Sequence, residues 1–76
     1  METTQPVDPR SRTMESWRAT LAVLASRGEV DTPRVVEARA ALSWHRCERF
    51  FRREITRGAL APATAEKMLD RLRGAK

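Results

Sequence analysis

Residues 33–57 read PRVVEARAALSWHRCERFFRREITR and form the longest periodic segment of the chain. Apolar residues recur there every three or four positions, which is the spacing of one face of an α-helix. They are Val36, Ala40, Trp44, Cys47, Phe51 and Ile55. A helix of this length spans about 37 Å at a rise of about 1.5 Å per residue. The sequence therefore predicts a long amphipathic helix whose stripe from Val36 to Ile55 faces a core.

A second helix is predicted on the N-terminal side, over residues 9–27. Asp8 can cap its free amides and Pro9 fits the first helical position, with Thr13 as a later alternative start. One stripe carries its apolar residues, which are Met14, Trp17, Leu21 and Leu24. Gly28 can adopt the left-handed conformation that ends a helix, and Val30 is expected to fold back onto the last turn. The short turn that follows, before the start signal Thr32-Pro33, predicts antiparallel packing of the two helices.

A third, shorter helix is predicted over residues 62–73. Gly58 gives the stop signal for the long helix, Pro62 opens the next one, and Gly74 ends it. Its apolar residues form a compact patch of Ala65, Met68, Leu69 and Leu72. The predicted fold class is all-α: a three-helix arrangement consisting of an antiparallel helical hairpin with a long middle helix plus a short third helix. Residues 1–7 are expected to be a flexible tail and residues 8–76 a single helical domain.

The composition limits the classes of protein to consider. The chain has 76 residues, enough for one small core, and one cysteine, which excludes an intramolecular disulfide. It shows no secretory signal and no apolar run approaching the roughly 20 residues of a membrane span, so no membrane partner and a cytoplasmic location are expected. The formal net charge of +5 suggests an anionic partner, although an arginine-rich composition is also typical of GC-rich genomes.

The residue types needed for catalysis are scarce. His45 and Cys47 are two positions apart, which places them on nearly opposite sides of a helix, and no phosphate-binding loop or metal-binding motif occurs. His45 is therefore interpreted as a surface histidine and Cys47 as an inert core thiol. Trp17 and Trp44 are interpreted as packing residues whose indole N–H groups reach partners at the rim of the core. We expect no enzymatic activity, no cofactor and no metal.

Most carboxylates are expected to form ordinary surface pairs with arginines. The helical spacing suits Arg34 with Glu37 and Glu48 with Arg52.

The unusual feature is the side of the long helix opposite its apolar stripe. Five arginines cluster there within a sector of roughly 80°. Val35 and Leu42 lie on the same side and Phe50 lies on its flank; core packing is favoured for Leu42. Guanidinium groups interleaved with apolar side chains suit a protein contact. The candidate partner-binding residues are Arg39, Leu42, Arg46, Arg49, Phe50, Arg53 and Arg57.

Three functions are compatible with these sequence features. The preferred hypothesis is a small regulatory or adaptor protein that binds the acidic surface of another protein through the middle helix. The first alternative is binding of a nucleic-acid backbone by the same arginines. A helix-turn-helix reader is not favoured, since the short third helix carries Glu66 and Asp70 beside its few basic residues. The second alternative is a homo-oligomeric bundle that covers the exposed end of the middle helix.

Overall fold

Three α-helices and one short 3-10 helix make up the fold of this computed structural model, which describes residues 8–74. The elements are η1 (Pro9–Ser11), α1 (Met14–Ser26), α2 (Pro33–Thr56) and α3 (Pro62–Leu72). The predicted all-α class and the long middle helix with a short third helix are confirmed. The tail expected over residues 1–7 lies outside the described residues.

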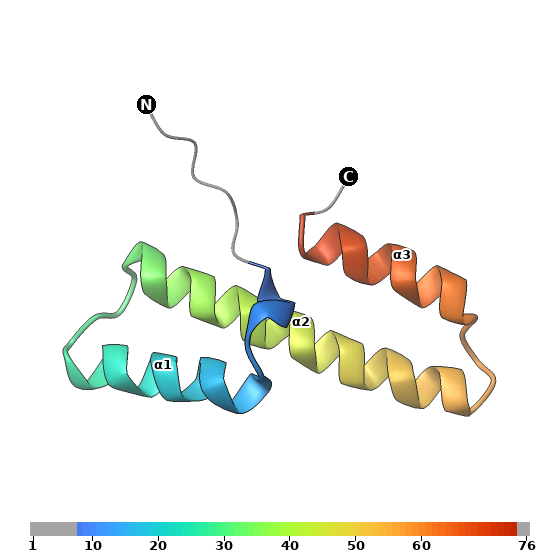
Figure 1. Cartoon of the computed structure of the whole chain (residues 1–76), viewed down its shortest axis with the longest axis horizontal. Helices are drawn as coiled ribbons and strands as arrows, with labels where there is room; N and C mark the ends of the chain where they lie inside the picture. The colour runs from blue at the N-terminus through green and yellow to red at the C-terminus, as the bar shows by residue number, and fades with distance from the viewer. Residues whose placement is uncertain (1–7, 75–76) are drawn as a thin grey trace.

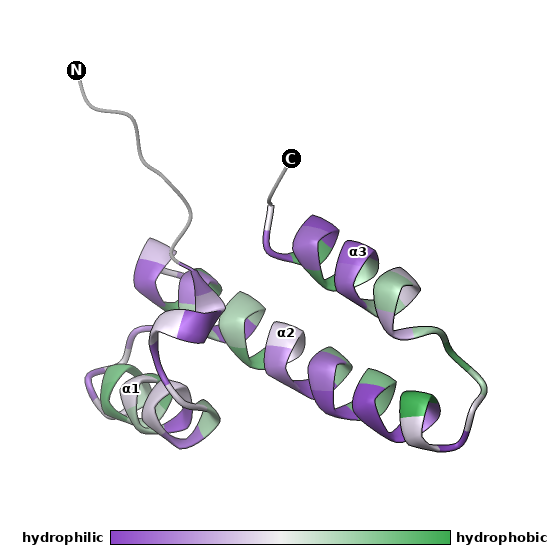
Figure 2. Ribbon diagram, turned by 45° about the vertical axis from the view of Figure 1, so that its right-hand side comes forward, coloured by the Kyte–Doolittle hydropathy of each residue, from purple (hydrophilic) through white to green (hydrophobic). Residues whose placement is uncertain are grey.

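The middle helix organises the molecule. α1 packs against the N-terminal half of α2, and α3 returns along its C-terminal half, at the other end and on a different side (Figure 1). Within residues 8–74, α1 and α3 do not touch each other. The molecule is accordingly flat, with extents of 43 × 31 × 17 Å. Each helix carries both hydrophilic and hydrophobic residues along its length, as expected for helices that are covered on one side (Figure 2).

The first helix begins later than residue 9, so the prediction of one continuous helix over 9–27 is wrong. Asp8 caps η1 by accepting a hydrogen bond from the backbone N–H of Arg10 at 2.9 Å. The chain is then extended at Arg12, and Thr13 caps α1 by accepting from the backbone N–H of Ser16 at 3.1 Å. Two capping signals lie close together here, and each begins an element of its own.

Glycine ends the first two α-helices as predicted. Gly28 and Gly58 both have a φ of 80°, in the left-handed region that side chains other than glycine rarely adopt. After Gly28, the N–H of Glu29 donates to the carbonyl of Leu24 at 3.0 Å, which closes the last turn of α1. Val30, which was expected to fold back onto that turn, is 61% exposed.

The N-terminal half of α2 buries a different stripe from the predicted one. Trp17 of α1 lies in a core cluster with Ala38, Ala41 and Leu42 of α2. The expected core residues Val36 and Ala40 are exposed instead. On a helix the two stripes differ by roughly 145° of rotation, and α1 approaches α2 from a different side than α3 does. A single stripe of α2 therefore cannot contact both α1 and α3.

The C-terminal half of α2 follows the prediction. Trp44 and Ala65 are buried where α2 and α3 meet, and the indole N–H of Trp44 donates to the backbone carbonyl of Leu69 at 2.9 Å. Cys47 is half-buried in this region, so its thiol is less enclosed than expected. Leu72, the last residue of the apolar patch predicted for α3, is 55% exposed.

Candidate functional site

Four exposed side chains form a compact patch on the C-terminal half of α2. The residues Arg46, Arg49, Phe50 and Arg53 are hereafter called the arginine patch. Each of them is three or four positions from two of the others, so neighbouring side chains of the patch lie next to each other on the helix surface. Phe50, at the flank of the three arginines, is 49% exposed. The patch thus combines three cations with one large apolar ring.

The packing of α3 explains why this side of α2 is open. The half-buried Phe51 and Ile55 continue the stripe that begins at Trp44, on the side of α2 that meets α3. The arginine patch lies on nearly the opposite side of the helix, as a step of about 100° per residue requires. α1 covers the N-terminal half of α2 only, with its first residue, Met14, close to the patch. No described element therefore covers the patch.

The charges of the patch are not neutralised by the described part of the chain. Among residues 8–74, no carboxylate lies within 4.0 Å of the guanidinium groups of Arg46, Arg49 or Arg53. Arg49 is steadied by a contact of 3.7 Å between its Nη1 and the Sδ of Met14, which is uncharged. Arg49 and Arg53 are like charges four positions apart, an arrangement that an anionic partner would stabilise.

The two outer arginines of the predicted set, Arg39 and Arg57, differ from the patch in having acidic neighbours within the chain. Arg39 precedes Arg46 by two helical turns, about 10 Å along the axis, and it lies 3.6 Å from the carboxylate of Asp31. Arg57 lies 3.3 Å from the carboxylate of Glu54. Both pairs are exposed and therefore weak, but they give these two guanidinium groups partners within the chain.

Leu42 does not belong to the surface that the sequence analysis assigned to partner binding. It is only 3% exposed and lies in the cluster around Trp17. The reason is the approach of α1, which covers this side of α2 one turn before the arginine patch begins. The favoured interpretation of Leu42 as a core residue is confirmed, and its candidate role as a contact residue is withdrawn.

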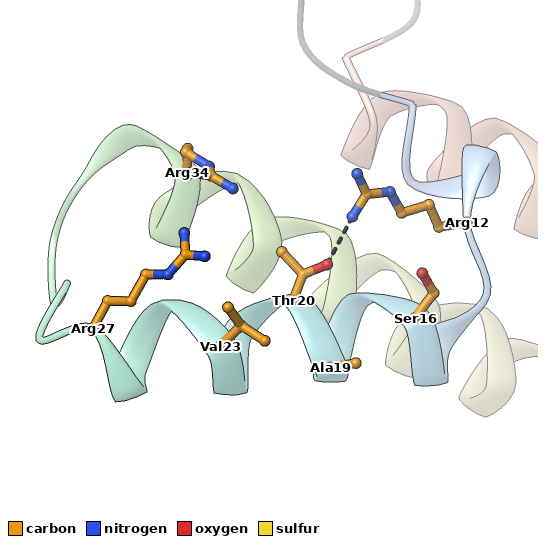
Figure 3. A pocket seen from close by; sticks show the side chains of 7 residues that line it. All are labelled: Arg12, Ser16, Ala19, Thr20, Val23, Arg27 and Arg34. Carbon is orange, nitrogen blue, oxygen red and sulfur yellow. Dashed lines mark hydrogen bonds between the residues drawn. The ribbon is translucent and has the colours of Figure 1, made fainter.

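Of the two predicted surface pairs, one is present. Arg52 forms an ion pair with Glu48, whereas Arg34 and Glu37 are not within salt-bridge distance. Arg34 instead lines a groove between α1 and α2, together with Arg12 and Arg27 (Figure 3). These three arginines come from three separate segments of the chain, so the periodicity of a single helix could not reveal the group.

His45 is half-buried, which corrects its interpretation as a surface histidine. Its Nε2 lies 2.9 Å from the backbone carbonyl of Pro9, which also accepts the indole N–H of Trp17 at 2.9 Å. Its ring meets that of Trp44 edge-on, with centroids 5.2 Å apart. These contacts give His45 a structural role in holding η1 against α2.

Two further properties complete the description of residues 8–74. No group of three or more histidine, cysteine or acidic side chains in this range is placed to hold a metal ion. None of its helices combines the length and the apolar character needed to cross a membrane.

The chain was compared with known proteins at the level of families, sequences and folds. No protein-family model, curated protein or solved structure gave a significant match. The structure defines the class as an all-α protein, with three α-helices over residues 8–74.

Proposed function

We propose that this protein is a small non-enzymatic interaction module, of the regulatory or adaptor kind, that binds the acidic surface of another protein through the arginine patch. One observation supports the proposal: three exposed guanidinium groups without a carboxylate partner in the described chain lie on one side of α2, with the half-exposed ring of Phe50 at their flank. Arginine and aromatic residues are the types enriched at the centres of protein interfaces.

The chemistry of the patch indicates what such a partner offers. Each guanidinium can donate two parallel hydrogen bonds to a carboxylate, and these charge-assisted bonds are stronger than neutral ones. Phe50 needs an apolar contact beside those carboxylates, because its ring loses contact with water only if the partner covers it. The expected partner surface is therefore acidic, with an apolar area next to its carboxylates.

The test compares two variants of equal charge. In one, Arg46, Arg49 and Arg53 are changed to Glu; in the matched control, the exposed residues Arg18, Lys67 and Arg71 are changed to Glu. Every substitution replaces a positive by a negative charge, so both variants have a formal net charge of −1 instead of +5. We expect the wild type and the control to retain a nuclease-resistant protein partner from host lysate, and the patch variant to lose it.

The two alternative functions give different results in the same experiments. Binding of a nucleic-acid backbone would be removed by nuclease and would weaken steeply with salt, whereas a contact anchored by Phe50 would depend less on salt. Self-association would appear as a mass that increases with concentration in light scattering, with the exposed Val36 and Leu72 as its apolar contacts. Retention of every partner by a folded patch variant would refute the proposal.

A further inference from the structure

A second cationic site, formed by other residues than the arginine patch, lies in an open groove between α1 and the beginning of α2. It has a volume of about 330 Å³, which is in the range of small-ligand sites. Three guanidinium groups line it, those of Arg12, Arg27 and Arg34 (Figure 3). Arg12 precedes α1, Arg27 ends it, and Arg34 lies in the first turn of α2. Folding therefore gathers three charges that are distant in the sequence.

The groove carries positive charge without internal compensation. None of its lining residues is acidic, and no carboxylate in the described chain lies within 4.0 Å of these three guanidinium groups. In Figure 3, Arg27 and Arg34 turn their guanidinium groups toward the same space from their two helices. Like charges held close together repel each other, and a bound anion would remove that repulsion.

One of the three arginines is already fixed in position. Nη1 of Arg12 donates to the hydroxyl of Thr20 at 2.7 Å, and its guanidinium carbon lies 4.8 Å from the ring centroid of Trp17. Because Trp17 is 1% exposed, the tryptophan side of this contact is rigid. A donor held in place loses less conformational entropy on binding than a mobile one.

We propose that this groove binds a phosphate monoester. A phosphate monoester carries close to two negative charges at neutral pH and three acceptor oxygens, which matches three guanidinium groups better than a carboxylate does. The hydroxyl of Ser16 lines the groove as a further donor, and Val23, which is 48% exposed, supplies an apolar surface for the organic part. Arg27 and Arg34 hold the phosphate from opposite helices, and Arg12 closes the other end.

The test is an NMR titration of the full chain at constant ionic strength with phenyl phosphate, phenyl sulfate and inorganic phosphate. We expect saturable shifts at the Arg27 and Arg34 Nε–H groups, with phenyl phosphate binding several-fold more tightly than the other two ligands. Phenyl sulfate lacks the second charge, and inorganic phosphate lacks the group that contacts Val23. The absence of saturable shifts, or equal binding of all three ligands, would overturn the proposal.

Two double variants with the same change in charge locate the site. Arg27→Gln with Arg34→Gln should weaken the binding of phenyl phosphate at least about tenfold, as expected when charged hydrogen bonds are lost. Arg49→Gln with Arg53→Gln should leave it unchanged, because those residues lie in the arginine patch. Equal weakening by both variants would show that net charge alone attracts the ligand. This outcome would overturn the groove proposal and leave the proposed protein contact untouched.

Discussion

Trp17 and His45 donate their ring N–H groups to the same acceptor, the backbone carbonyl of Pro9, each over 2.9 Å. Nε2 of His45 must carry a proton in this arrangement, because a carbonyl oxygen only accepts hydrogen bonds, and its two lone pairs allow both bonds at once. Trp17 belongs to α1 and His45 to α2, so this one carbonyl fastens η1 to both helices. Pro9 itself is buried at the junction.

The shared acceptor predicts that Trp17 and His45 are energetically coupled. Trp17→Phe or His45→Leu alone leaves the Pro9 carbonyl with one donor, whereas the double variant leaves it with none. An unsatisfied buried carbonyl costs about 1–3 kcal/mol. We therefore expect the double variant to lose about 1 kcal/mol more than the sum of the single losses, measured as free energies of unfolding in urea. His45→Gln, which keeps an N–H near the same place, should be milder than His45→Leu. Strictly additive losses would contradict the coupling.

The ion pair of Asp8 with Arg10 predicts that the stability of the fold depends on pH in the acid range. A side-chain hydrogen bond from Arg10, followed by one from the Arg10 backbone, lowers the pKa of Asp8 from 3.8 to about 2. Because the folded value lies below the unfolded one, the stabilisation is fully present above pH 3.8 and is lost as the pH falls through about 2. The guanidinium of Arg73 lies 3.9 Å from the same carboxylate, so this charge also links η1 to the end of α3.

The measurement compares the melting temperatures of the wild type and Asp8→Asn across the acid range. The wild type should melt higher at neutral pH, and the difference should disappear as the pH approaches 2, where Asp8 itself becomes protonated. Circular dichroism at neutral pH provides the control that the variant keeps its helices. A difference that persists undiminished at the acid end would show that the carboxylate charge is not the cause.

Much of the fold could be predicted from the sequence, because the decisive signals are local. Thr32 before Pro33 starts α2, and Gly58 ends it with the left-handed backbone that its position requires. The stripe from Trp44 to Ile55 correctly identified the side of α2 that meets α3. These signals act within one or two helical turns, so they can be read before the tertiary structure is known.

The remaining features depend on how the helices approach one another. Val36 and Leu42 lie on two different apolar stripes of α2, and only the position of α1 determines that Leu42 is buried and Val36 is exposed. For the same reason Leu42 is not part of the arginine patch. Arg39 and Arg57 are left out of the patch because each has an acidic neighbour within the chain. The groove around Arg27 and Arg34 lies between two helices, and no pattern within either helix indicates it.

The choice between the two stripes predicts effects of very different size for two similar substitutions. Leu42 is 3% exposed, so Leu42→Ala should remove a buried side chain and lower the free energy of unfolding by about 2–4 kcal/mol. Val36 is 55% exposed, and Val36→Ala should change it by less than about 0.5 kcal/mol. Chemical denaturation of the two variants provides the comparison. A larger loss for Val36→Ala than for Leu42→Ala would indicate that the predicted stripe through Val36, and not the stripe through Leu42, faces the core.

The arginine patch should contribute little to the stability of the isolated protein. Arg53 lies four positions from both Arg49 and Arg57, and each like-charge pair costs a few tenths of a kcal/mol in a helix. Arg53→Gln should therefore raise the melting temperature slightly at low salt, and the gain should shrink as salt screens the charges. Arg57→Gln is the control: it also gives up the ion pair with Glu54, so its gain should be smaller.

A clear loss of stability in Arg53→Gln would mean that this arginine supports the fold through a contact of its own, and the case for a partner would weaken. The expected small gain has the opposite meaning. It would show that the free protein is more stable without the Arg53 charge. That charge would therefore serve the contact with a partner and not the stability of the fold. Repeating the melt with bound partner should reverse the sign, because the Arg53→Gln complex lacks a charge-assisted contact and melts below the wild-type complex.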